Sequence, residues 1–245
     1  GVEIGRGVQE LKKRVKRMNV IVKNIPNSVT CLNLFSGCIA SVAAFNAEFE
    51  TAAVFIALAA IFDFLDGMLA RLLKAYSPLG KELDSLADLI SFGMAPALLV
   101  FSYLKLSTFW ATGFLADYLP YTAFLIAVFS GLRLAKFNID TRQTTSFIGL
   151  PVPANALFWI GTCFYSLQHN INPYIIIVLV IVFSGLLVSE IPMFSLKFKN
   201  LSFKDNYIRY LLIAGAVVLI VVFGVSGLAA TIGLYLILSI LRKGH

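Results

Sequence analysis

The stretch that decides the fold runs from Asp63 to Gly93 and reads DFLDGMLARLLKAYSPLGKELDSLADLISFG. It places four aspartates at the facing ends of two long apolar segments, with the turn-forming residues Ser77, Pro78 and Gly80 between them. The apolar flanks predict two antiparallel membrane helices joined by this turn. An ionised side chain inside a bilayer costs about 2.5 to 3.5 kcal/mol. Four acids at this position therefore need a compensating role.

The composition extends the membrane assignment to the whole chain. Of 245 residues, 59% are hydrophobic and only 13% are charged, with a mean hydropathy of +0.86. These values exclude an ordinary soluble domain. The net charge of +7 then indicates cytosolic loops and anionic lipid, and no nucleic-acid partner is expected.

The few cysteines and histidines limit which kinds of catalytic or metal site the chain can form. The chain has three cysteines without a CxxC spacing, and only two histidines. A disulfide framework, a His-rich metal site and a Ser-His-Asp triad are therefore not expected. Any chemistry must depend on carboxylates.

We expect an all-α integral membrane protein with about eight transmembrane helices, six in a catalytic core and two at the C-terminus. An apolar run of about 20 residues is long enough to cross a bilayer as a helix. The expected spans are 27–46, 49–73, 82–106, 120–138, 153–169, 173–190, 208–224 and 226–241, with 109–118 as a short loop or interfacial turn.

The distribution of positive charge predicts the orientation. With the N-terminus in the cytoplasm and eight crossings, 19 of the 20 lysines and arginines fall inside, and only Lys105 falls outside. Both termini and the aspartates are then cytosolic, in a cell inner membrane. The long polar start does not resemble a secretory signal peptide.

Three parts of the chain are expected. Residues 1–23 form a basic N-terminal segment, residues 24–190 the membrane core, and residues 191–245 a cytosolic loop with two additional helices. Within the first part, residues 1–17 fit a linker remnant as well as a native basic surface helix.

Helical geometry predicts that the aspartates converge. At about 100° per residue, Asp63, Asp66, Gly67, Ala70 and Arg71 lie within one arc of roughly 140° on the second span. The remaining two aspartates, four residues apart, share a face of the returning span. Gly67 and Ala70 lack bulk, which leaves room for a ligand or a neighbouring helix.

The charge of this cluster suggests a divalent cation. Asp63, Asp66, Asp84, Asp88 and Arg71 together carry a formal charge of −3, which would repel a phosphate ligand. Oxygen ligands suit Mg²⁺, Mn²⁺ or Ca²⁺, and two cations sharing carboxylates commonly serve phosphoryl chemistry. Spacing alone leaves three interpretations open: metal-assisted phosphate chemistry, a cation transport path, or acids that reach the membrane interface.

The full spacing is more specific. The pattern Asp63-x-x-Asp66-Gly67-x-x-Ala70-Arg71, then eight residues, then Gly80-x-x-x-Asp84-x-x-x-Asp88 resembles the signature of the CDP-alcohol phosphatidyltransferases. The resemblance implies a membrane enzyme that displaces CMP from a CDP-linked lipid with an alcohol, using two divalent cations (Mg²⁺ or Mn²⁺, with Ca²⁺ as a further option).

The resemblance also implies roles for individual residues. Asp63, Asp66 and Asp84 would be metal ligands, and Asp88 would complete the second metal site and act as general base. The residues expected to contact the nucleotide and its phosphates are Asn27, Thr30, Gly67, Ala70, Arg71, Ser77 and Gly80. Helix capping explains Asn27 and Thr30 equally well.

A second basic region bears on the acceptor alcohol. Arg133 and Lys136 lie three residues apart on one predicted helical face, where they would bind an anionic acceptor or act as ordinary cytosolic anchors. Asn138 would either contact the acceptor or end a helix. The segments GLRLAKFNID and SFIGLPVPANA resemble the phosphatidylserine synthase branch of the family, although Lys136 stands where that branch often has arginine.

The branch resemblance implies that CDP-diacylglycerol and L-serine give phosphatidylserine and CMP in the lipid bilayer. Charge alone does not separate serine from glycerol 3-phosphate or inositol phosphate as the acceptor. A carboxylate-lined cation transporter is the alternative from another class, and a homodimer within the bilayer is a further expectation.

Overall fold

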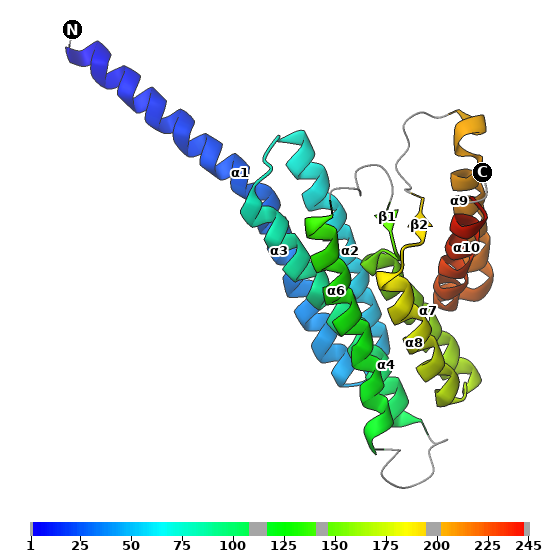
Figure 1. The fold of residues 1–245 in the computed structure, drawn as a ribbon. Helices are drawn as coiled ribbons and strands as arrows, with labels where there is room; N and C mark the ends of the chain where they lie inside the picture. The colour runs from blue at the N-terminus through cyan, green and yellow to red at the C-terminus, as the bar shows by residue number, and fades with distance from the viewer. Residues whose placement is uncertain (1, 108–116, 141–146, 195–201, 243–245) are drawn as a thin grey trace.

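The computed structural model describes residues 2–107, 117–140, 147–194 and 202–242, which are almost entirely helical (Figure 1). In chain order, the elements are α1 (Val2–Phe45), α2 (Phe49–Leu72), α3 (Pro78–Asp88), the π-helix η1 (Leu89–Met94), α4 (Ala95–Leu106), the 3-10 helix η2 (Leu119–Phe124), α6 (Leu125–Ile139), β1 (Phe147–Ile148), α7 (Val152–His169), α8 (Pro173–Val188), β2 (Pro192–Met193), α9 (Phe203–Phe223), the 3-10 helix η3 (Gly224–Ser226) and α10 (Gly227–Arg242). The segments 109–116, 141–146 and 195–201, which the sequence assigned to loops, lie outside the described residues.

The first helix begins much earlier than predicted. We expected a span starting after Pro26, whereas α1 runs without interruption from Val2 to Phe45 and contains that proline. A proline lacks one backbone N–H and strains its helix, but the surrounding hydrogen bonds can carry the helix past it. In Figure 1 the N-terminal part of α1 extends beyond the bundle.

The third span also begins earlier, within the predicted turn. Ser77 is the N-cap of α3, and its Oγ accepts a hydrogen bond from the Gly80 backbone N–H at 2.9 Å. Pro78 follows at the first helical position, where its missing N–H costs nothing. These start signals place the beginning of the helix at Pro78 rather than at residue 82.

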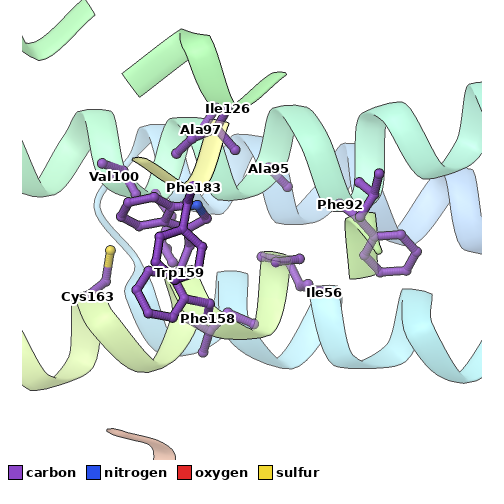
Figure 2. Packing of buried hydrophobic residues seen from close by; sticks show 14 of the residues in the cluster. Ile56, Phe92, Ala95, Ala97, Val100, Ile126, Phe158, Trp159, Cys163 and Phe183 are labelled. Carbon is purple, nitrogen blue, oxygen red and sulfur yellow. The ribbon is translucent and has the colours of Figure 1, made fainter. Parts of the chain in front are cut away.

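The continuous rod from α3 through η1 to α4 lies at the centre of the bundle. It is mostly buried, whereas α2 exposes most of its length. Figure 2 shows the packing around it, with Val100 and Ala97 next to Trp159 and Phe183. The Phe158 and Phe183 rings stack with their centroids 3.6 Å apart. This core fixes α7 against the rod that carries two of the aspartates, and α8 against α7.

The molecule is an all-α, multi-pass membrane protein. Among the described residues, five segments are long and apolar enough to cross a bilayer: 24–45, 49–72, 78–106, 119–139 and 206–241, the last of which covers most of α9 and α10. The helix α8 is apolar but only 16 residues long. Helices occupy all eight expected positions, and the number that crosses the membrane stays a prediction.

A short pair of strands, here called the clasp, joins the segment before α7 to the segment after α8. Strands β1 and β2 pair antiparallel, with Phe147 opposite Met193 and Ile148 opposite Pro192. Gly149 adopts a φ of +76°, and its N–H donates to the Ile191 carbonyl at 2.9 Å. A side chain at residue 149 would be strained by this φ and would press against the Leu187 carbonyl. The clasp therefore fixes the chain between Leu187 and Pro192.

The contact between α1 and η1 gives a stability prediction. A Cβ added to Gly37 would lie 2.8 Å from the Ser91 Cα, so the two backbones would have to separate. We expect Gly37→Ala to lower the free energy of unfolding by about 1 to 3 kcal/mol, as overpacking does. Thermal unfolding in detergent would measure it. The matched control is Gly185→Ala on α8, where an added Cβ meets no described atom within 4 Å.

Candidate metal and phosphate site

Three of the four aspartates meet at one point. One carboxylate oxygen each from Asp63, Asp66 and Asp84 lies within 4.8 Å of the other two. Asp63 and Asp84 are close enough for a carboxyl–carboxyl hydrogen bond. The predicted convergence of α2 with α3 is thus confirmed for these three side chains. Clustered carboxylate oxygens are the ligands that a hard divalent cation prefers, so the residues present fit such an ion.

The fourth aspartate lies deeper and outside that group. Asp88, at the end of α3, is buried, and its Oδ1 accepts a hydrogen bond from Asn33 Nδ2 at 3.3 Å. Its charge interacts with those of Asp63 and Asp84. The π-helix begins at the next residue, and π-helical turns occur frequently at functional sites. Asp88 therefore lies beside the three clustered aspartates, and the Asn33 amide donates to it.

Helix α1 orients two of the acids. The Thr30 hydroxyl donates to Asp66 Oδ2 at 2.5 Å, and Asn33 donates to Asp88. Ser91 Oγ in turn donates to the Asn33 carbonyl at 3.0 Å. Sequence reasoning missed Asn33. The signal was present, because Asn27, Thr30 and Asn33 recur every three residues and share a face of the first helix.

A cavity of about 490 Å³ opens beside the aspartates, between α1, α2 and α3. Its lining includes all seven residues that we expected to contact a nucleotide, Asn27, Thr30, Gly67, Ala70, Arg71, Ser77 and Gly80, together with Asp66, Asp84 and Lys81. The structure thus brings the residues predicted to contact a nucleotide together beside the aspartate cluster. Arg71 is exposed at the cavity and offers a cation.

Two glycines shape this cavity in different ways. A Cβ on Gly67 would meet no described atom within 4 Å, so this glycine leaves space open. A Cβ on Gly80 would lie 2.8 Å from Asn27 Oδ1 and 3.0 Å from Ser77 Oγ. Gly80 therefore allows α1 to approach the N-terminus of α3 closely. That approach places Asn27 and the Ser77 cap on the same wall.

A second cavity of about 300 Å³ lies at the end of α6. It is lined by Arg133, Lys136, Ile139, Asp140, Ile148, Leu187, Val188, Ser189 and Glu190. Both cations that we expected at an acceptor site are among them. Lys136 Nζ also donates to the Val188 carbonyl at 3.4 Å, which ties α6 to the C-terminal end of α8.

The third residue expected at the acceptor is placed elsewhere. Asn138 Nδ2 donates to Ser85 Oγ at 2.9 Å, and the Asn138 carbonyl accepts from Lys81 Nζ. Among the described residues, Asn138 does not line either cavity. It joins α6 to α3 instead, because the side chain of residue 138 points to a different side of α6 from those of residues 133 and 136.

The arrangement fits chemistry on a phosphate at one end of the bundle. The grouped carboxylates can hold divalent cations, the adjoining cavity can take a nucleotide, and Asp88 can accept a proton. A transport path would need further acids along the central rod. Between Leu89 and Leu106 the chain has none.

Comparisons with known proteins agree with this geometry. A family model described as CDP-alcohol phosphatidyltransferase matches residues 23–222. A Bacillus subtilis protein named CDP-diacylglycerol–serine O-phosphatidyltransferase is 36% identical over 68% of this chain and 88% of its own length. Proteins of the same name from Mycobacterium bovis and Helicobacter pylori are 32% and 31% identical, over 92% and 89% of this chain and 76% and 90% of their own lengths.

Proposed function

Since the chain belongs to the CDP-alcohol phosphatidyltransferase family, we propose that it transfers the phosphatidyl group of CDP-diacylglycerol to the hydroxyl of L-serine, giving phosphatidylserine and CMP. The protein is a membrane-embedded transferase of phospholipid biosynthesis. The observation that carries the proposal is the meeting of three aspartates beside a cavity lined by the expected nucleotide residues. The relatives reported above bear the name CDP-diacylglycerol–serine O-phosphatidyltransferase.

The proposed location is a cell inner membrane, with both termini and the active site on the cytosolic side. This side is supported by the lysine and arginine distribution, and by the water-soluble nature of CMP and serine. A homodimer within the bilayer is part of the proposal. Residues 24–190 are its proposed catalytic core.

The cavity between α1, α2 and α3 is the proposed site of the CDP moiety. Arg71 and Lys81 would pair with its phosphate oxygens, and Gly67 would give the nucleotide room to approach α2. Asn27 and Ser77, the N-cap of α3, offer polar atoms on the opposite wall. The acyl chains would extend into the surrounding lipid.

Asp63, Asp66 and Asp84 are the proposed ligands for two divalent cations, Mg²⁺ or Mn²⁺, with Asp88 completing the second site. When bound, such cations neutralise the diphosphate and the charge that develops on the leaving CMP. The carboxylates themselves hold the cations beside the phosphates. Thr30 keeps Asp66 in position.

Asp88 is the proposed general base. The serine hydroxyl would attack the phosphorus that carries the lipid, forming a new O–P bond, while the bond from that phosphorus to the CMP oxygen breaks. The hydroxyl proton passes to the Asp88 carboxylate, which makes the weak nucleophile reactive. The hydrogen bond from Asn33 leaves the second oxygen of Asp88 available for this proton.

A reconstituted assay tests the proposal. Purified protein is given CDP-diacylglycerol, Mg²⁺ or Mn²⁺, and one acceptor at a time, while CMP release is followed. We expect release with L-serine and none above background with glycerol 3-phosphate or inositol phosphate. CMP release that does not depend on serine would redirect the assignment to a sibling reaction. Absence of release with every acceptor would contradict the enzyme class itself.

A further inference from the structure

The end of α6 forms a wall of both cavities. Phe137 lines the cavity between α1, α2 and α3, here called the nucleotide cavity, whereas Arg133, one helical turn earlier, lines the second cavity. None of the described residues lines both. Residues four apart are neighbours on a helix surface, so these two side chains can touch. A contact between them would join one cavity to the other.

The contact is a guanidinium against an aromatic ring. Arg133 Cζ lies 5.1 Å from the centre of the Phe137 ring, within the distance at which a ring face attracts a cation. Arg133 is 7% exposed, and its Nε and Nη2 atoms have no hydrogen-bond partner among the described residues. Because no hydrogen bond orients these two atoms, packing against Phe137 helps to fix the plane of the guanidinium.

The Phe137 ring is only half-buried, and it borders the nucleotide cavity. The attraction between a cation and a ring is weak where water reaches them and grows when they are desolvated. A nucleotide in the cavity would cover the exposed part of the ring and displace water from it. Filling the nucleotide cavity would therefore strengthen the contact that holds Arg133 in the second cavity.

The backbone that carries this ring is anchored to α3. Asn138, the next residue, donates from Nδ2 to Ser85 Oγ at 2.9 Å, and its carbonyl accepts from Lys81 Nζ at 2.9 Å. Lys81 also lines the nucleotide cavity, and its ammonium group has further protons to donate to a phosphate oxygen. A bound nucleotide can therefore press on Phe137 without displacing the end of α6.

We propose that Phe137 is a positioning residue that couples the two cavities, so that a nucleotide in one strengthens the binding of an anionic group by Arg133 in the other. This inference rests on the proposed function, in which the nucleotide belongs to CDP-diacylglycerol and the anionic group is the carboxylate of L-serine. It adds that the two substrates bind with positive coupling. Coupling is reciprocal, so serine strengthens nucleotide binding by the same factor.

The test measures the dissociation constant of L-serine with and without CDP, a nucleotide that carries no phosphatidyl group to transfer. For the unmodified protein in Mg²⁺, we expect saturating CDP to lower this constant about threefold to tenfold, as expected when a cation–π contact is desolvated. Phe137→Leu keeps an apolar side chain but has no ring, so CDP should leave its serine constant nearly unchanged. Phe137→Tyr keeps the ring and should keep the coupling.

A matched variant and a second readout separate coupling from folding. Phe129→Leu makes the same change about two turns earlier on α6, at a half-buried ring that lines neither cavity among the described residues, and should keep the coupling. With both substrates saturating, kcat of Phe137→Leu should stay near that of the unmodified protein, because the aspartates are unchanged.

Three results would overturn the inference while leaving serine transfer intact. They are equal coupling in Phe137→Leu and in the unmodified protein, loss of coupling in Phe129→Leu, and absence of coupling in the unmodified protein. Failure of the proposed function would appear differently, as no CMP release when the unmodified protein is given CDP-diacylglycerol and L-serine.

Discussion

Asp88→Asn is expected to lose turnover even when its substrates and cations are bound. The asparagine has the same shape, and its Oδ1 can still accept the hydrogen bond from Asn33, so the end of α3 and the start of η1 should not move. What disappears is the ability to accept a proton. General base catalysis contributes about 10²- to 10⁴-fold, and we expect kcat to fall by that factor. CMP release at saturating serine and Mg²⁺ measures it.

Two controls test whether the effect of Asp88→Asn comes from loss of the base. Binding of CDP-diacylglycerol to Asp88→Asn should be unchanged, because the three clustered aspartates remain. Raising the concentration of the cation should not restore turnover, because a bound cation does not replace the missing proton acceptor. Asp117→Asn changes an exposed aspartate directly before η2, remote in sequence from the motif, and should behave as the unmodified protein does. Normal turnover by Asp88→Asn would remove this residue as the base.

The motif on α2 and α3 carried most of the site prediction. Residues three and four apart on a helix share a face whatever surrounds them, and a short turn forces two helices to return side by side. Those two facts were enough to bring Asp63 and Asp84 together before any tertiary contact was known. The bounds of the helices were less certain, as Pro26 inside α1 and the early start of α3 show.

The second cavity, lined by Arg133 and Lys136, could not be predicted to the same depth. Glu190 reaches the cavity because β1 pairs with β2 and Gly149 turns the chain, and these contacts join residues some forty positions apart. No periodic pattern marks a two-residue strand. The placement of Asn138 could not be predicted for a related reason, since its partner Ser85 lies on another helix, 53 positions away. Its role at the acceptor stays a prediction.

Asp66→Asn is expected to abolish activity because it weakens cation binding, whereas Asp88→Asn removes the proton acceptor. Asp66 belongs both to the clustered carboxylates and to the wall of the nucleotide cavity. An amide there supplies one neutral oxygen in place of a charged one. Changes to the groups that merely orient a metal ligand cost about 10- to 100-fold in affinity. We expect loss of the ligand itself to weaken apparent Mg²⁺ or Mn²⁺ affinity by about a hundredfold or more.

Thr30→Val tests whether the loss of activity in Asp66→Asn comes from weaker cation binding. Valine keeps the volume of threonine but cannot donate to Asp66 Oδ2, so the carboxylate remains and only its orientation is released. Apparent cation affinity in a titration of CMP release should then fall by about 10- to 100-fold, with kcat recovered at high cation concentration. A chelator should abolish CMP release by both variants and by the unmodified protein. If Thr30→Val lost kcat at saturating cation, Asp66 would act on the chemistry directly and its assignment as a metal ligand would fail.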